Sequence, residues 1–214
     1  MIEQPIRNRQ AERREATRLE ILDAAWEIAR QRSLAEVTLR EIAERIGMRP
    51  PSLYTHFDSK SAVIDAMFGT AWAEYLRSVT ELHGDLPAEP RTALHVLARH
   101  FFDFAVADLA RFQLMNQRTL PDFSPSADSY APAVEVLERL TSTLVSIGLP
   151  DEGDRDLYVA LIGGLVDAQL ANDPGGQRWS RLLPRAIDMF ADEVGLPQIP
   201  GTPRSPRTRA RSAR

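Results

Sequence analysis

The stretch VTLREIAERIGMRPPSLYTHFDSKSAVIDAMF, residues 37–68, decides the fold of this chain. Thr38 precedes apolar residues at helical spacing, and Glu41 follows it by three positions, which is the pattern of a capping box at the start of a helix. Gly47 ends this helix, since glycine is common just past a helix C-terminus. The pattern therefore predicts one short helix followed at once by a tight turn.

A second short helix begins at Pro50 and Pro51, which suit a first helical turn because the amides there have no partner within the helix. Leu53 and Phe57 form its inward face. Two short helices around a glycine-containing turn have helix-turn-helix geometry, in which the second helix enters the major groove. The alternative is a helical hairpin with a solvated polar face. The side chains left facing outward can hydrogen-bond to bases and phosphates: Ser52, Tyr54, Thr55 and His56.

Residues 37–68 closely resemble the DNA-binding head of the tetracycline-repressor (TetR-like) family. The resemblance covers the head, whereas the rest of the chain agrees in being helical and of the right length. The features that match the family in order and spacing are Thr38, the pair Ile42 and Ala43, Gly47, the pair Leu53 and Tyr54, the pair His56 and Phe57, and Lys60.

The resemblance implies that Tyr54 and Lys60 bind phosphates and that Thr38 both caps its helix and approaches the DNA backbone. This chain departs from the family at Arg49, which stands with two prolines where the family often has a small hydroxyl residue. The prolines remove two backbone donors, so Arg49 either attracts a phosphate or reads a guanine. The full set of expected DNA-binding residues is Thr38, Arg40, Arg49, Pro50, Ser52, Tyr54, Thr55, His56 and Lys60.

Helical periodicity continues along the chain, and no segment alternates apolar and polar residues as a strand does. The sequence therefore predicts an all-α fold, with a three-helix helix-turn-helix head followed by a helical ligand-binding and dimerisation body. A kink or a later start is expected in the last helix at Pro184. The expected helices cover residues 10–31, 39–46, 50–57, 60–82, 93–109, 112–117, 133–147, 151–171 and 180–194, with a loop over 121–129.

Charge is unevenly distributed along the chain. Residues 1–60 contain 11 Lys and Arg against 10 Asp and Glu, residues 61–196 contain 10 against 20, and residues 197–214 contain five against none. We expect an N-terminal arm and DNA-binding domain over 1–59, a ligand-binding and dimerisation domain over 60–196, and a disordered basic tail over 197–214. Basic ends on an acidic body suit a polyanion that touches one end, although solvated arginines are the alternative. In this family an N-terminal arm can reach the adjacent groove, which here concerns Arg7, Arg9, Arg13, Arg14 and Arg18.

Aromatic and methionine side chains gather in the central helices, where the family's bodies resemble ligand receptors. Plain core packing is the alternative for each of them. A metal site at His100 and Asp103 is not expected, because no second carboxylate and histidine pair accompanies them, and no cofactor is expected. The candidate ligand-binding residues are Trp72, Tyr75, His100, Phe101, Phe104, Phe112, Met115 and Asn116.

The last two helices are expected to form a homodimer interface. Gly163 and Gly164 offer a flat place for close helix approach, although such a pair also suits packing within one subunit. The candidate interface residues are Leu161, Gly164, Leu165, Ala168, Ile187 and Phe190.

Composition excludes several classes of function. The chain contains no cysteine, which removes disulfides and thiolate metal sites. No nucleophile elbow, phosphate loop or dinucleotide fingerprint is present, so an enzyme is not expected. No apolar run reaches the roughly 18 residues of a membrane span, and residues 1–10 are polar, so a cytoplasmic protein without a membrane partner is expected.

The sequence favours a repressor that a small-molecule effector releases from a palindromic stretch of double-stranded DNA. In the expected mechanism, ligand displaces the helix over residues 60–82 and changes the separation of two reading heads. Activation instead of repression stays open within the family. The alternative from another class is a helical homodimeric interaction protein that does not bind DNA.

Overall fold

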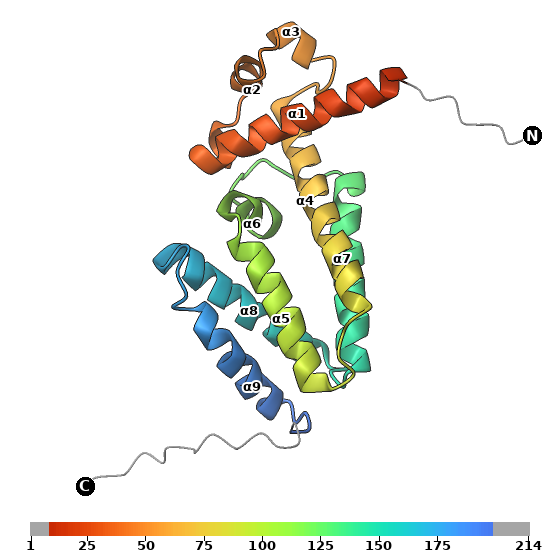
Figure 1. Ribbon diagram of the computed structural model, residues 1–214, viewed down its shortest axis with the longest axis vertical. Helices are drawn as coiled ribbons and strands as arrows, with labels where there is room; N and C mark the ends of the chain where they lie inside the picture. Colours follow the sequence, from red (N-terminus) through yellow and green to blue (C-terminus); the bar gives the residue numbers. More distant parts are fainter. Residues whose placement is uncertain (1–8, 199–214) are drawn as a thin grey trace, which may run out of the picture.

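The computed structural model describes residues 9–198, and every regular element in that range is helical (Figure 1). The predicted all-α class is confirmed. None of the helices within this range is long and apolar enough to cross a membrane. The α-helices are α1 Arg9–Gln31, α2 Leu39–Arg45, α3 Pro50–Leu53, α4 Lys60–His83, α5 Pro90–Val106, α6 Leu109–Asn116, α7 Ala127–Ser146, α8 Glu152–Asn172 and α9 Leu183–Glu193, and two 3-10 turns span Leu34–Glu36 and Ser180–Leu182.

Helices α1, α2 and α3 form a small head at one end of the elongated molecule, and α1 lies across the start of α4 (Figure 1). The predicted inward residues Leu53 and Phe57 are buried, together with Ile21 from α1 and Ile42 from α2. Apolar burial of this kind is the main favourable term that holds short helices together, because they are marginal in isolation. The short helix α3 therefore depends on the core behind it.

Helix α4 joins the head to the body. It begins in the head, where the Ser59 side chain caps it by accepting a hydrogen bond from the Ala62 amide at 3.1 Å. Its first turns bury Val63 and Met67 in the head core, and its later turns pack along α7. A Cβ atom at Gly69 would lie 3.1 Å from Ser129 of α7, so glycine permits this close approach.

The start of α7 is fastened to α4 by one carboxylate. Asp65 accepts hydrogen bonds from the Ser126 amide at 2.7 Å, the Ser126 hydroxyl at 2.7 Å and the Ser129 hydroxyl at 2.8 Å. Burial opposes ionisation of Asp65, but these three hydrogen bonds outweigh it and hold the pKa of the carboxyl below its usual range.

The second layer of the body packs α5 against α8 and α9. Its core includes Leu94, Phe102, Tyr158, Ile162 and Ile187, all of which are buried. The Tyr158 hydroxyl donates to the Leu94 carbonyl at 2.7 Å, which satisfies the one polar group of that side chain inside the core.

The predicted helix over residues 93–109 is wrong at both ends. The Glu89 carboxylate accepts from the Arg91 and Thr92 amides, which starts α5 at Pro90. At the other end the Asp108 side chain accepts from the Arg111 amide and starts α6 as a separate helix. Two acidic N-caps therefore set boundaries that apolar periodicity alone did not reveal.

The predicted loop over residues 121–129 extends too far, because α7 begins at Ala127 behind the cap residue Ser126. Pro132 lies inside this helix, near its start, rather than before it. In the last predicted helix, a 3-10 turn precedes α9, and Pro184 stands in the first turn of α9. The later start expected from Pro184 is confirmed.

Candidate DNA interface and cavity

Helix α3 lies at the tip of the head, at the end of the molecule away from the body (Figure 1). Its side chains that face solvent include Tyr54, which is 53% exposed although it is large and aromatic. Arg49, the N-cap residue, is exposed and makes no side-chain capping hydrogen bond. Pro50 and Ser52 are exposed as well. The structure brings these four predicted residues together on one open surface.

The remaining predicted residues of this turn make contacts within the head. The Thr55 hydroxyl donates to the Ser52 carbonyl at 2.7 Å. His56 is half-buried, and its Nδ1 atom is enclosed without a hydrogen-bond partner. Lys60, the first residue of α4, donates from Nζ to the Ala35 carbonyl at 2.5 Å. Hydroxyl and ammonium groups have further hydrogen-bonding capacity, so these contacts leave DNA binding possible for Thr55 and Lys60.

Helix α2 is capped as predicted at its first turn. The Thr38 hydroxyl accepts from the Glu41 amide at 3.2 Å. The Glu41 carboxylate, expected to complete a capping box, instead forms an ion pair with Arg32 at 2.9 Å. Arg40 projects into solvent and forms an ion pair with Glu44 one turn later at 2.9 Å.

Two arginines of α1 contact Thr55 and His56, which follow α3 in the chain. This role was not predicted from the sequence. Arg18 donates to the His56 carbonyl at 2.5 Å, and its guanidinium lies 4.0 Å from the centre of the Phe57 ring. Arg14 donates to the Thr55 carbonyl at 3.4 Å. The one sequence signal for this role is the spacing of four residues between the two arginines, which places both on the same face of a helix. They position α3 within the head, whereas Arg7 of the expected arm lies outside the described residues.

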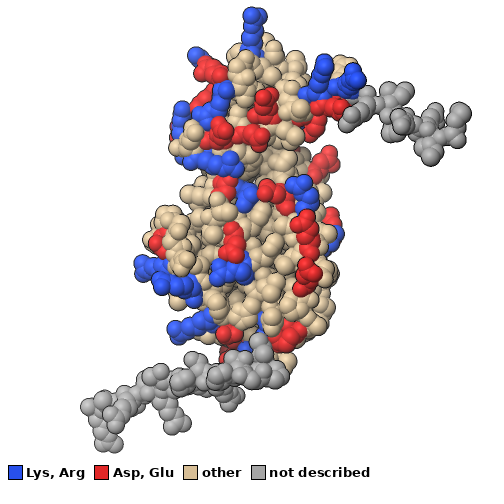
Figure 2. Space-filling model, in the orientation of Figure 1, with Lys and Arg blue, Asp and Glu red and all other residues tan. Residues whose placement is uncertain are grey.

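Charged side chains of both signs are interspersed on the face of the head that Figure 2 shows. Arg45 of α2, for example, is paired with Glu27 of α1 at 3.3 Å. An arginine paired in this way has its charge offset by the carboxylate. Attraction of a polyanion therefore depends on the arginines that lack an acidic neighbour. The arginines of the expected basic tail lie beyond residue 198, outside the described part of the chain.

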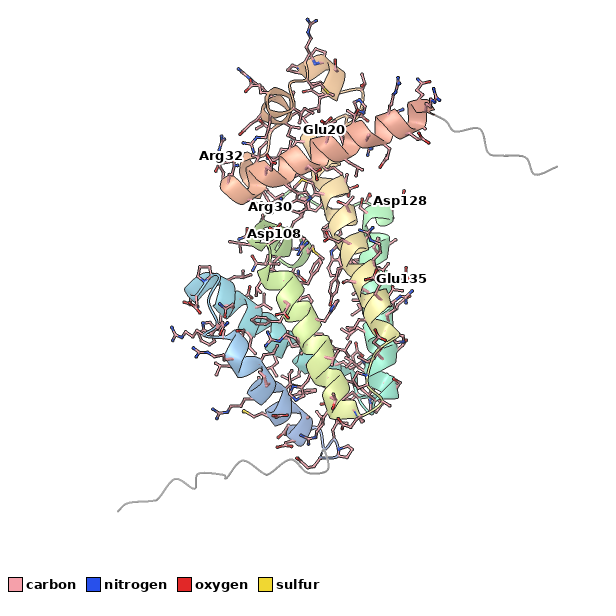
Figure 3. The ribbon with its side chains drawn as sticks, in the orientation of Figure 1. Glu20, Arg30, Arg32, Asp108, Asp128 and Glu135 are labelled. Atoms are coloured by element: carbon pink, nitrogen blue, oxygen red, sulfur yellow. The ribbon has the colours of Figure 1, made fainter. Side chains whose placement is uncertain are left out.

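The head meets the body through an ion pair between α1 and α6. Arg30 and Asp108 are 2.7 Å apart, and the Asp108 side chain is only 9% exposed (Figure 3). The chain of contacts continues inward, because the Arg111 guanidinium lies 3.8 Å from the centre of the Phe104 ring. The centre of that ring lies 4.7 Å from the centre of the Tyr75 ring.

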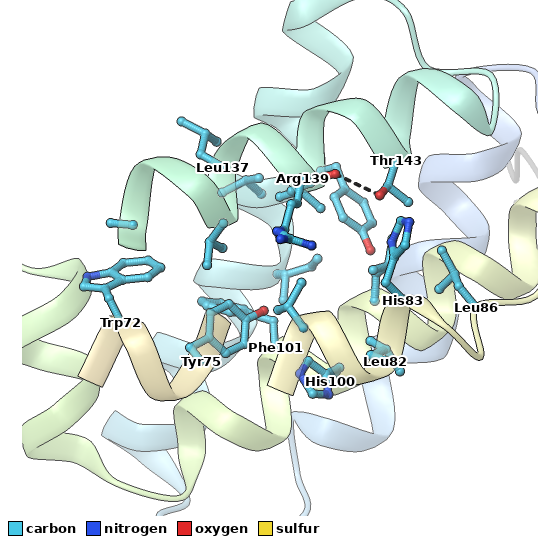
Figure 4. Close-up of a pocket in the computed structure, with 18 of the residues that line it drawn as sticks. Trp72, Tyr75, Leu82, His83, Leu86, His100, Phe101, Leu137, Arg139 and Thr143 are labelled. Atoms are coloured by element: carbon cyan, nitrogen blue, oxygen red, sulfur yellow. Dashed lines mark hydrogen bonds between the residues drawn. The ribbon is translucent and has the colours of Figure 1, made fainter. Parts of the chain in front are cut away.

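Tyr75 lines a cavity of about 160 Å³ between α4, α5, α7 and α8 (Figure 4). Of the predicted ligand-binding residues, Trp72, Tyr75, His100, Phe101 and Asn116 line this cavity. The other three do not: Phe104 packs behind Tyr75, while Phe112 and Met115 are buried in the cores. The structure therefore brings five of these predicted residues together at this cavity and places the other three outside its wall.

Several polar residues of the cavity wall were missed by the sequence analysis. They come from the end of α4 and from α7 and α8: His83, Arg139, Thr143 and Tyr158. Burial raises the pKa of the Tyr75 hydroxyl above its ordinary value, so that group stays protonated. Burial lowers the pKa of His100, although the nearby Asp103 opposes this shift. No group of metal-ligating side chains occurs within residues 9–198.

The surface of α8 and α9 divides the predicted dimer residues into two groups. Gly164 is exposed, with open space beyond its Cα atom, and Leu161, Leu165 and Ala168 are half-buried. Ile187 and Phe190 are instead buried in the subunit's own core. Large apolar side chains that the prediction omitted are exposed on α8, on α9 and on the 3-10 turn between them: Leu157, Met189 and Leu182.

An exposed short helix held on a compact three-helix head, with a helical body behind it, defines a helix-turn-helix regulator. A sequence model described as "Bacterial regulatory proteins, tetR family" matches residues 21–67. The tetracycline repressor protein class A from transposon 1721 of Escherichia coli is 28% identical over 186 residues, which cover 82% of this chain and 81% of that protein.

Two solved structures share the fold. A TetR-family transcriptional regulator from Bordetella parapertussis has a TM-score of 0.61 at 19% identity, covering 82% of this chain and 94% of its own. The regulator FadR from Bacillus subtilis, in complex with stearoyl-CoA, has a TM-score of 0.59 at 18% identity, covering 80% and 96%. Residues 21–67 therefore form a TetR-family helix-turn-helix DNA-binding domain, and the similarity along the rest of the chain supports a transcriptional regulator of that family. Such regulators bind DNA and small molecules and are generally not enzymes.

Proposed function

We propose that this chain is a ligand-responsive repressor that binds a palindromic operator as a homodimer and leaves it when a small molecule fills the body. The observation that carries the proposal is the open surface of α3, where Arg49, Ser52 and Tyr54 project away from a buried core. The functional division is a DNA-binding domain over residues 1–59, a ligand-binding and dimerisation domain over 60–196 and a basic tail over 197–214.

In the DNA complex, the exposed face of α3 lies in the major groove. Tyr54 and Lys60 bind phosphates, whereas Arg49, Ser52 and Thr55 contact base edges. Thr38 and Arg40 approach the backbone from the neighbouring helix, and Pro50 fixes the start of α3. His56 is the remaining predicted contact, and it is half-buried with its Nδ1 atom enclosed in the head.

A second copy of the chain packs on α8 and α9. Support comes from the exposed Leu157, Leu182 and Met189, since exposed apolar surface of this kind marks association sites. The open space over Gly164 admits a partner helix at close range. Replacing Gly164 with Leu should fill that space and shift the chain to monomer in sedimentation velocity, and an unchanged dimer would place the interface elsewhere.

Ligand binding in the cavity repositions the heads through two helices. Helix α4 carries Tyr75 at the cavity and Lys60 in the head, and α6 meets α1 through Asp108 and Arg30. Two heads must stand about 34–36 Å apart, or a multiple of that spacing, to fit one face of a duplex. A small displacement of either helix changes this spacing, and a coupling of about 1–3 kcal/mol would release DNA by about 5- to 150-fold.

The DNA-binding half of the proposal is tested without any ligand. The full chain should enrich specific genomic fragments, and sequencing them should reveal an inverted repeat. Binding to that repeat should weaken steeply with added salt, because phosphate contacts release counterions. A protein that enriches no sequence and shows no salt dependence on duplex DNA would be the helical interaction protein without DNA binding.

The coupling half is tested by filling the cavity with a side chain. Val136 of α7 is buried and lines the cavity, so Val136→Phe should act as a tethered ligand and weaken binding to the selected repeat about fivefold or more. Val134→Phe is the matched control, because Val134 lies on the same helix, is exposed and does not line the cavity. Equal DNA affinities for the two variants, both folded by circular dichroism, would contradict the coupling.

A further inference from the structure

The charged and titratable side chains that line the cavity supply no negative charge. The basic ones are Arg139, His83 and His100, the two tyrosines Tyr75 and Tyr158 stay protonated because burial raises the pKa of each, and none of the described residues that line the cavity is Asp or Glu. The remaining wall is mainly aliphatic and aromatic. An apolar site needs few polar groups to orient a ligand, so the sign of these groups determines which head group fits.

Arg139 supplies the permanent charge. It extends from α7 toward the cavity, and His83 reaches toward the same space from the end of α4 (Figure 4). The Arg139 side chain is 38% exposed and is paired with Glu135 one turn earlier at 2.6 Å. Since a guanidinium has five donors in a planar fork, it can bind a second carboxylate beside the first.

The acidic group that acts on His100 is already engaged. Asp103, whose charge acts on His100, is paired with Arg99 at 3.0 Å. A cationic ligand would therefore bury its charge next to Arg139 without a free carboxylate on the wall to receive it, which is costly. A ligand with an anionic group would instead place its charge next to the Arg139 guanidinium, which attracts it.

The cavity also limits the size of the ligand and presents the Tyr75 hydroxyl as a donor. Its volume of about 160 Å³ is below the ~300–1,000 Å³ of sites for drug-sized molecules. The Tyr75 hydroxyl points into the cavity (Figure 4) and has no hydrogen-bond acceptor among the described residues. A ligand that brings an oxygen acceptor would satisfy a donor that is otherwise unpaired in an apolar site.

We propose that the cavity selects a small apolar monocarboxylate, of the medium-chain aliphatic kind, with its carboxylate near Arg139 and His83 and its chain toward Trp72. This inference rests on the proposed use of the cavity as the effector site. It specifies the chemical class of the effector, an organic acid rather than a cation or a neutral alcohol.

Calorimetric titration of the full chain with three eight-carbon probes tests the proposal. Octanoate should bind most tightly, 1-octanol about two- to fivefold more weakly, as expected for a half-exposed ion pair, and octylammonium most weakly. Octanoate binding should also be lost in Val136→Phe, which fills the cavity. Octylammonium binding as tightly as octanoate, or no binding of octanoate, would overturn the assignment.

Substitutions at Arg139 and Glu135 test whether Arg139 selects the carboxylate, as opposed to a general loss of ligand binding. Arg139→Gln combined with Glu135→Gln should lower octanoate affinity to that of 1-octanol and leave 1-octanol unchanged. Glu135→Gln alone should strengthen octanoate binding, because it frees the guanidinium. Arg77→Gln is the charge-matched control on the exposed side of α4, outside the cavity wall. An unchanged octanoate preference in the double variant would refute the role of Arg139.

The failure of this inference is distinguishable from failure of the proposed function. If the chain selects an operator and Val136→Phe releases it, but octylammonium is the preferred probe, only the ligand class is wrong. If octanoate binds as expected but no DNA sequence is enriched, the cavity assignment stands and the repressor is refuted.

Discussion

The head and the body of this protein are both helical, but their interiors are packed differently. The head packs α1, α2 and α3 tightly around Ile42, Leu53 and Phe57, which have almost no exposure. The body packs its helices around a cavity of about 160 Å³. A filled core fixes the position of a reading helix, whereas an unfilled one leaves room for a ligand to change the arrangement. The difference indicates which part of the chain is rigid and which part is adjustable.

The largest expected effect tests whether the two interiors differ in packing. Leu53→Ala should lower the free energy of unfolding by about 2–5 kcal/mol, because the side chain is surrounded on all sides. Leu140→Ala, at a half-buried wall of the cavity, should cost about half as much, since part of that side chain faces empty space. Urea unfolding followed by circular dichroism measures both, and equal losses would remove the contrast.

A second prediction concerns the support of α3 by α1. Arg18→Met keeps the apolar stem but removes the hydrogen bond to the His56 carbonyl and the charge over Phe57. We expect a loss of about 1–2 kcal/mol in the free energy of unfolding, together with weaker DNA binding. Arg13→Met, at an exposed position on the same helix, is the control. If both variants behave alike, Arg18 does not position the reading turn.

A third prediction separates reading from folding in the head. Tyr54→Ala should weaken binding to every duplex about tenfold, or about 1.4 kcal/mol, without changing sequence preference. Its stability should be nearly unchanged, because the side chain is half in solvent. Arg49→Ala should instead change which repeat is preferred. Gel-shift titrations on the selected operator and on a scrambled duplex measure both effects, and a change of preference in Tyr54→Ala would reverse the assigned roles.

The smallest expected effect is a pH dependence in the body. The folded pKa of Asp65 lies below its unfolded value of about 3.9, so its stabilising contribution is complete above that pH. It is lost as the pH falls through the lower, folded pKa. Asp65→Asn should therefore reduce the loss of stability between pH 6 and pH 3, measured by urea midpoints. Glu81→Gln, an exposed change on the same helix, should leave the pH profile as it is.

The head was predictable from sequence because its signals are local. Thr38, Gly47 and the two prolines mark helix ends within a few residues of each other, and Leu53 and Phe57 define the inward face by spacing alone. Gly47 confirms this in the structure, since its φ of +65° is the left-handed conformation that glycine adopts readily. The contacts of Arg14 and Arg18 could not be predicted in this way, because their partners are carbonyls 41 and 38 residues away in the sequence.

The cavity was only half predictable. Tyr75 and Phe101 are aromatic and stood out by residue type, but Phe104 and Phe112 stood out equally and face elsewhere. Arg139 is neither aromatic nor apolar, so residue type did not mark it, and it lines the cavity because α7 packs along α4. Which side of a helix faces a void depends on tertiary packing, and periodicity reports burial without reporting empty space.

Asp108 gives the junction between head and body an unusual property. One of its oxygens accepts from the Arg111 amide and so begins α6, while the other accepts from Arg30 of α1. A single carboxylate is thus shared between the end of one helix and the side of another. Rotation of the head on the body would therefore disturb the start of α6 and the Arg30 contact together, which links the position of α1 to the capping of α6.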